Sequence, residues 1–187
     1  MNMPEMADIE QLPLPQARAG EPVAWDVLFR RYQLPLYVYA VELVHSEQVA
    51  LDIVQETFIA AVKHIDGLRE DGKFGSWLFG IARQKIIQRW RKRTEILVEE
   101  IPEALDELAD SPDEWLIRRE SEAEFMNLLE QLSSSHRSVL LLHFIEDFSL
   151  EEIAQIEATT IGTVKSRLHY AKKSLRKLLE TKNENAT

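Results

Sequence analysis

Two runs of basic residues are the features of this sequence most able to bind a polyanion. Each run holds six Lys or Arg residues and no acid, although the 187-residue chain has a net charge of −10. The runs are residues 83–93 and 165–177. Clustered Lys and Arg neutralise nucleic-acid phosphates. Between the runs, residues 95–124 are strongly acidic, so the charge asymmetry predicts a bipartite ligand. One such run alone would be more typical of the solvated face of a helix, but two runs, each at the end of a helical segment, favour the polyanion.

The remaining residue types give little support for an enzyme. There is no cysteine, which excludes disulfides, thiolate catalysis and cysteine-based zinc sites. The five histidines are scattered and lack metalloprotease spacing, and we find neither a phosphate-binding loop nor a nucleophile elbow. We therefore expect no enzymatic activity and no cofactor. The start resembles no secretory signal and no stretch is long and apolar enough to span a membrane, so the expected location is the cytoplasm.

Helical spacing of apolar residues dominates the chain, and strand alternation is nearly absent. We expect an all-α fold of two small helical domains, residues 21–94 and 114–180, joined by an acidic linker over 95–113. Residues 1–20 and 181–187 are expected to be a disordered tail and a frayed end. The front domain should hold a helix that Pro35 kinks or breaks, a second helix over 47–65 and a third over 74–93. The rear domain should begin with a helix marked by Trp115, Phe125 and Leu128.

The rear domain carries the strongest functional pattern. Ser149 and Glu152 form a capping box that opens a short helix, and a brief interruption over 157–160 precedes a longer basic helix. This succession predicts a helix-turn-helix, whose second helix enters the major groove of DNA. The exposed residues at its start would read bases, and the later lysines would contact phosphates. The predicted set is Thr163, Lys165, Ser166, Arg167, His169, Lys172 and Lys173.

Several segments resemble one protein family. Residues 149–154 (SLEEIA) and 161–168 (IGTVKSRL) are similar to region 4 of the extracytoplasmic-function class of bacterial sigma factors. Residues 52–58 (DIVQETF) and the Phe-x-x-Trp-Leu-x-x-Ile-Ala pattern of 74–82 are similar to region 2. The resemblance covers about 24–93 and 125–179 in the family's order. It implies a transcription initiation factor whose partners are core RNA polymerase and promoter DNA.

The resemblance also implies roles for particular residues. Asp52, Gln55 and Glu56, which share one helix face, would dock on the clamp of the polymerase's largest subunit. Region 4 would meet the flap of the second-largest subunit. The loop before residue 74 and the helix after it would capture the unwound −10 element, and the second helix of the helix-turn-helix would read the −35 element. The predicted −10 set is Lys73, Phe79, Arg83, Gln84, Lys85, Arg89, Arg91 and Lys92.

Some positions depart from the family pattern. Gln84 stands where Asn is usual, which alters the expected base preference, and Gln88 replaces a common Asp. Residues 157–159 (Glu-Ala-Thr) replace a Leu-Gly-Ile type turn. Loss of the glycine should cost little if the turn avoids positive φ, whereas loss of two apolar residues should thin the core by about 1–3 kcal/mol. We therefore expect a less stable rear domain.

Other interpretations remain open from the sequence. Phe79 and Trp77 are both candidate platforms for flipped bases, although Trp77 falls on the apolar side and fits the core better. The acidic linker fits a path through the polymerase cleft and fits a flexible tether equally well. An anti-sigma partner is common in the family, but no residue here indicates one. The alternative function is a helix-turn-helix regulator that binds duplex DNA without acting as a sigma subunit.

Overall fold

The computed structural model describes residues 12–95 and 128–185, and within these ranges every regular element is helical. The all-α prediction is thus confirmed for the described part of the chain. Residues 96–127, which include most of the acidic linker together with Trp115 and Phe125, lie outside the described residues.

The front half consists of four α-helices and two short 3-10 turns. They are α1 (Leu14–Arg18), α2 (Pro22–Val44), α3 (Glu47–His64), η1 (Ile65–Gly67), η2 (Asp71–Lys73) and α4 (Phe74–Glu95). Proline suits the first turn of α2, and the Ser46 hydroxyl accepts the Val49 amide 3.4 Å away to cap α3. The predicted inner face of α3 is buried, from Ala50 at 0% exposed to Phe58 at 8%.

Two features of the front half differ from the sequence predictions. Pro35 does not break helix α2, which runs through it as one element. The proline removes one backbone donor, but its neighbours Leu36 and Tyr39 are buried, and their packing offsets that loss. Residues 14–18, expected to belong to a disordered tail, form α1. Their Leu14 and Ala17 are buried, and the Trp25 indole donates to the Ala17 carbonyl at 3.0 Å.

The rear half starts with a helical turn at 128–130, followed by α6 (Ser134–Leu140), the π-helical segment η3 (Leu141–Ile145), α7 (Leu150–Ile156) and α8 (Ile161–Asn185). Ser133 caps α6 by accepting the His136 amide. The capping box at Ser149 and Glu152 is confirmed, with both reciprocal hydrogen bonds present. Helix α8 continues to Asn185, past the point where fraying was expected.

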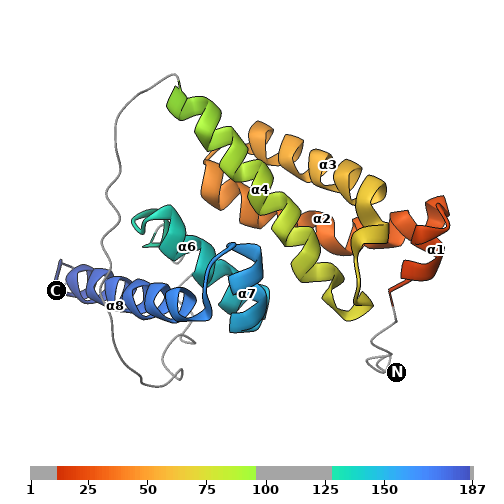
Figure 1. The fold of residues 1–187 in the computed structure, drawn as a ribbon. Coiled ribbons are helices and arrows are strands. Elements are labelled where there is room, and N and C mark those ends of the chain that lie inside the picture. The colour runs from red at the N-terminus through yellow and green to blue at the C-terminus, as the bar shows by residue number, and fades with distance from the viewer. Residues whose placement is uncertain (1–11, 96–127, 186–187) are drawn as a thin grey trace, which may run out of the picture.

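The two halves share a continuous apolar core. Helix α7 lies against α4, and α6 lies against α2, while α8 runs along the outer side of the rear half (Figure 1). The Phe148 ring packs edge-on to the Phe79 ring with centroids 5.1 Å apart, and Phe79 in turn contacts Tyr39. The front and rear halves therefore form one body.

Candidate functional site

The start of α8 presents polar and basic side chains beside a well-capped turn. The Thr160 hydroxyl accepts the Thr163 amide at 3.1 Å, which fixes the first turn of the helix. Lys165 and Lys173 are exposed, whereas Thr163, Ser166 and His169 are half-buried. The Lys172 ammonium lies 5.5 Å from the centroid of the Phe144 ring. The predicted −35 residues thus occur on one helix, but only part of the set is fully open to solvent.

The turn between α7 and α8 differs from both sequence expectations. Ala158 takes a φ of 50°, the left-handed region that favours glycine, so the turn does not avoid positive φ. Glu157, which replaces an apolar residue of the family pattern, is buried. Its carboxylate lies 2.9 Å from Arg83 Nε and 3.3 Å from Arg167 Nη1. The position is occupied by a buried ion cluster, not left as a thin place in the core.

The predicted −10 residues divide into three groups. The first lies around a groove between the 67–73 loop and α4, which is lined by Lys73, Trp77 and Gln84 and by Gln155 of α7. Lys73 also pairs with Glu70 at 3.1 Å. Trp77, half-buried against Phe74, contributes to both the core and the groove wall. An amide, an indole and an ammonium side by side can hydrogen-bond a base edge, stack on it and contact its phosphate.

The second group, Phe79 and Arg83, is turned into the core. Phe79 is fully buried between Tyr39 and Phe148 and cannot stack on a base in this arrangement, so that prediction is wrong for the structure described. The Arg83 side chain is only 9% exposed and is paired with Glu157, with its guanidinium carbon 5.1 Å from the Trp90 ring centroid. Arg83 is likewise closed to phosphates here, because a buried acid neutralises it.

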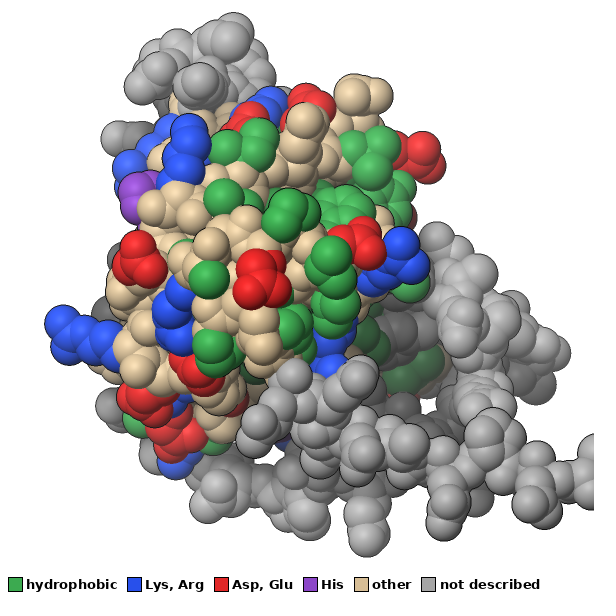
Figure 2. Space-filling model, turned by 90° about the vertical axis from the view of Figure 1, so that its right-hand side faces the viewer, with side chains coloured by type: hydrophobic (Ala, Val, Ile, Leu, Met, Phe, Trp, Pro, Cys, Tyr) green, Lys and Arg blue, Asp and Glu red, His purple; other side chains and the backbone are tan. Residues whose placement is uncertain are grey.

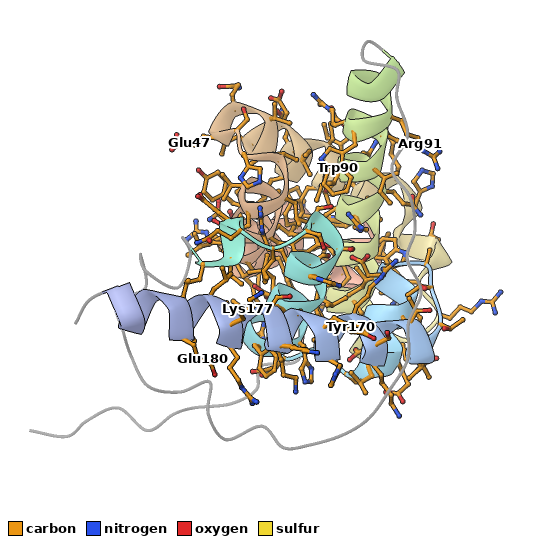
Figure 3. The ribbon with its side chains drawn as sticks, turned by 90° about the vertical axis from the view of Figure 1, so that its left-hand side faces the viewer. Glu47, Trp90, Arg91, Tyr170, Lys177 and Glu180 are labelled. Carbon is orange, nitrogen blue, oxygen red and sulfur yellow. The ribbon has the colours of Figure 1, made fainter. Side chains whose placement is uncertain are left out.

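The third group follows the far half of α4. Arg89 contacts Glu56 at 2.5 Å and Asp52 at 3.9 Å, and Lys85 lies 3.8 Å from Glu56. Two of the three residues predicted to dock on polymerase therefore face basic residues of α4. Arg91 is exposed, and it leaves α4 on the side opposite Trp90 (Figure 3). Lys92 is helical, but its side chain lies outside the described residues.

An apolar groove between α2 and α3 is the feature that sequence reasoning missed. Gln55 lines it together with Leu34, Leu51 and other apolar side chains, namely Phe29, Tyr37, Val54, Phe58 and Ile59. Leu34 is 65% exposed and Leu51 is 53% exposed. Hydrophobic side chains also lie among charged ones on the side of the molecule shown in Figure 2. The sequence does contain a signal for this groove, because residues 51, 55, 59 and 62 form a second stripe at helical spacing on α3.

Two titratable groups have perturbed pKa values with clear causes. Burial raises the pKa of Tyr39, and the nearby negative charge of Glu157 adds to the effect. Burial also raises the pKa of Glu146 to about 7, with a further contribution from adjacent Asp147. Residues 12–95 and 128–185 contain no group of three His, Asp or Glu side chains placed to hold a metal ion. Helices long and apolar enough to cross a membrane are likewise absent from those residues.

Comparison with known proteins decides the family. Residues 28–96 match sigma-70 region 2, and residues 122–175 match sigma-70 region 4. The RNA polymerase sigma-H factor of Pseudomonas aeruginosa is 30% identical over 176 residues, which cover 88% of this chain and 91% of that protein. The chain belongs to the sigma-70 family, in its extracytoplasmic-function class. This sigma factor binds core RNA polymerase and directs initiation at promoters by recognising −10 and −35 elements.

Further relatives agree with this assignment. SigW of Bacillus subtilis, an extracytoplasmic-function sigma factor, is 29% identical and covers 88% of this chain and 93% of its own length. Among solved structures, the sigma factor RpoE of Bartonella quintana, crystallised with the anti-sigma factor NepR, is 27% identical with a TM-score of 0.63. It covers 82% of this chain and 96% of its own. CnrH, at 24% identity and a TM-score of 0.66, shares the fold over 93% of this chain and 99% of its own.

Proposed function

We propose that three surfaces of this sigma factor divide the work of promoter recognition. Helix α8 reads the −35 element, the groove beside Trp77 and Gln84 captures the −10 element, and the apolar groove between α2 and α3 docks on core polymerase. The observation that carries the proposal is the capped α7–turn–α8 unit. Its second helix begins at Ile161, carries Thr163 and Lys165 near its start and continues into a basic face.

The −35 role follows from geometry and charge. A helix is the element that fits the major groove, and its N-terminal residues lie nearest the base edges. Lys165, Ser166 and Arg167 occupy that position in α8, and His169 and Thr163 flank them. Lys172 and Lys173 lie about three turns from the helix start, where they can contact phosphates.

The −10 role is assigned to the groove lined by Lys73, Trp77 and Gln84. A single strand needs a cation for its backbone and a surface that accepts an unstacked base. Gln84 is exposed on the groove wall and offers both a donor and an acceptor to a base edge. Arg91 extends the basic path along α4, and Lys85 and Arg89 join it when they exchange their acid partners for phosphates. Lys92 stays in the proposed set on the sequence alone.

Apolar area, and not charge, is the main feature of the proposed polymerase-docking surface. Asp52 and Glu56 are engaged by Arg89 and Lys85, whereas Gln55 lies at the rim of the apolar groove. Helices commonly bind by laying an apolar face into such a groove. We therefore place Leu34, Leu51 and Ile59 at the centre of the polymerase contact, with Gln55 and the two acids at its edge.

Two substitutions test these surfaces separately. Arg167→Ala should weaken binding of the holoenzyme to its preferred promoter by roughly 1–3 kcal/mol and relax the preference at one base of the −35 element. An equal loss of affinity for every DNA sequence would indicate that Arg167 contacts only phosphates. Leu51→Glu should abolish association with core polymerase in a pull-down, while Lys63→Glu, at an exposed position in the last turn of α3, should retain it. Equal binding by both variants would remove the groove from the interface.

The broader assignments belong to the same proposal. We infer that the chain has no enzymatic activity of its own and acts in the cytoplasm with polymerase. An anti-sigma factor is a candidate partner, because the related RpoE of Bartonella quintana was crystallised with one. A regulator that binds duplex DNA alone predicts no transcript from core polymerase plus this chain, whereas the sigma assignment predicts one.

A further inference from the structure

Arg18, the last residue of α1, contacts the loop that joins α3 to α4. Its Nη2 atom donates two hydrogen bonds, one to the Leu68 carbonyl at 3.1 Å and one to Asp71 Oδ1 at 2.6 Å. These partners lie 50 and 53 positions further along the chain. Figure 1 shows α1 on the side of the molecule where this loop leads into α4. One guanidinium therefore ties the N-terminal helix to both the backbone and a side chain of the loop.

Helix α1 is itself fixed on the front half, so it can serve as an anchor. Five residues are too few to form a stable helix alone, but Leu14 and Ala17 are each only 2% exposed. The Trp25 indole of α2 donates to the Ala17 carbonyl at 3.0 Å. Gly20 takes the left-handed conformation that commonly follows a helix C-terminus, with a φ of 79°, and its amide donates to the same carbonyl at 3.0 Å. Arg18 is thus held at a defined place beside the loop.

The contacted loop forms part of the wall of the −10 groove. Leu68, Arg69 and Lys73 line this groove together with Trp77 and Gln84 of α4. Residues 68–70, between the turns η1 and η2, belong to no regular element. A binding wall of irregular backbone needs supporting contacts to keep its side chains at fixed positions. The base preference of the groove therefore depends on what holds this loop.

The other hydrogen bonds described for the loop are local. The Lys73 amide donates to the Glu70 carbonyl at 3.0 Å, and the Lys73 ammonium lies 3.1 Å from the Glu70 carboxylate. Such bonds join residues three positions apart, so they set the shape of a turn and not its place on the molecule. Burial of the Leu68 side chain anchors the first part of the loop. Arg18 adds the contact at Asp71, in its second part.

We propose that Arg18 is a positioning residue for −10 recognition, which holds the 68–73 loop through Leu68 and Asp71 in the place that gives the −10 groove its base preference. This inference rests on the −10 role proposed above for that groove. Arg18 lies outside the set of residues that line the groove, so it acts through the loop and not on the DNA. Helix α1 also precedes the segment that matches sigma-70 region 2, which begins at residue 28. The contact is therefore not part of the matched family pattern.

Arg18 also neutralises the Asp71 carboxylate, and the two effects predict different results. The Arg18 and Asp71 side chains are 28% and 51% exposed, so solvent weakens the ion pair. An unpaired carboxylate beside the groove would nevertheless repel DNA phosphates. If Arg18 acted only by neutralising this charge, Asp71→Asn would make Arg18 unnecessary. If Arg18 positions the loop, Asp71→Asn removes one of its two contacts and leaves the loop less well held.

The first measurement is hydrogen–deuterium exchange of the full chain without polymerase. Arg18→Met removes both donated hydrogen bonds and keeps an unbranched side chain. The amides of residues 68–73 should then exchange about five-fold faster than in the parent chain, because the loop opens more often. The matched control is Arg30→Met, which removes an exposed arginine that pairs with Asp26 on α2. This control should leave exchange in the loop unchanged.

The second measurement is transcription by the holoenzyme from two promoter libraries, one randomised in the −10 element and one in the −35 element. Arg18→Met should reduce discrimination among −10 sequences about five-fold, because a loop held in place for only part of the time selects bases less well. Discrimination among −35 sequences and association with core polymerase should not change. Arg18→Lys, which keeps a charged donor, should restore part of the −10 discrimination. Asp71→Asn should lose part of it, and Arg18→Met/Asp71→Asn should lose as much as Arg18→Met.

Three results would overturn the positioning role. One is exchange and −10 discrimination in Arg18→Met equal to those of Arg30→Met. Another is full recovery of −10 discrimination in the double variant, which would leave Arg18 only the neutralisation of Asp71. The third is unchanged discrimination in Asp71→Asn, which keeps α1 intact and so tests the loop contact even if Arg18→Met folds poorly.

The parent chain separates this inference from the proposed function. A parent holoenzyme that selects −10 sequences, combined with Arg18 variants that select them equally well, overturns the positioning role and supports the groove. A parent holoenzyme without any −10 preference overturns the role of the groove, and the role of Arg18 with it.

Discussion

Two acid–base clusters on α4 pair basic residues with carboxylates, and they differ chiefly in their access to water. At one, Arg89 lies over Asp52 and Glu56 of α3, with side chains 33% to 43% exposed. At the other, Arg83 meets a Glu157 side chain that is fully buried. Solvent screens the first cluster, so its charges can exchange partners at little cost. The second cluster loses its hydration when the ion pair forms, so removal of one partner leaves a buried charge without compensation. The same acid–base pairing therefore gives an exchangeable surface contact at the Arg89 cluster and a fixed contact between helices at the Arg83 cluster.

The largest effect should come from breaking the buried cluster on one side. Arg83→Leu leaves the buried Glu157 carboxylate without the guanidinium that it pairs with, and we expect a loss of about 3–5 kcal/mol in the free energy of unfolding. Urea denaturation followed by circular dichroism measures it. The double variant Arg83→Leu/Glu157→Leu should recover most of the loss. A single-variant loss no larger than that of an exposed pair would contradict the role given to burial.

The backbone of the turn beside Glu157 should respond in the opposite direction. Ala158 has a φ of 50°, so Ala158→Gly should raise the free energy of unfolding by roughly 0.5–1 kcal/mol. The control is Ala60→Gly within α3, where glycine should destabilise by about 1 kcal/mol. Thermal melts distinguish the two signs. Destabilisation by both would show that the turn does not need a left-handed residue.

The exposed cluster should be nearly neutral. Arg89→Ala removes contacts to Asp52 and Glu56, yet the loss in the free energy of unfolding should stay below about 1 kcal/mol and shrink further in high salt. Paired urea titrations at low and high ionic strength check this. A large loss that persists in salt would mean that this cluster, too, is a structural joint.

A separate pH dependence of stability should arise outside both clusters. The pKa of Glu146 is raised to about 7 from an ordinary 4.5, so the folded state binds this proton more tightly than the unfolded state. Its contribution to stability is therefore fully present below pH 4.5 and is lost as the pH rises towards 7. Glu146→Gln should flatten that slope in urea titrations at pH 5 and pH 8. An unchanged slope would assign it to other groups.

Local features of the fold were predictable from the sequence because their causes are local. The caps at Ser46, Ser133 and Ser149 and the inner face of α3 depend on neighbours within four residues. Helix α1 was missed because five residues give too short a pattern. The course of α2 through Pro35 was missed because tertiary packing outweighs one lost hydrogen bond.

The sequence predicted which residues belong to the candidate site, but it did not predict which of them are exposed and which are buried or paired. Arg83 and Glu157 are separated by 74 positions, and no periodicity relates residues at that distance. The expectation that the Glu-Ala-Thr turn thins the core failed because it treated Glu157 as a missing apolar side chain, whereas the residue has two arginine partners. Phe79 and Trp77 stand two residues apart in α4, and which of them is fully buried depends on Phe148 in the other half. Motif resemblance names functional residues without stating which are free in a given arrangement.

The most direct test of the account is transcription by purified core polymerase plus this chain across a library of randomised promoters. The account predicts transcripts whose templates are enriched in two separate sequence blocks at a fixed spacing, one for the Gln84 groove and one for α8. Transcripts no more abundant or sequence-selective than those from core polymerase alone would contradict it.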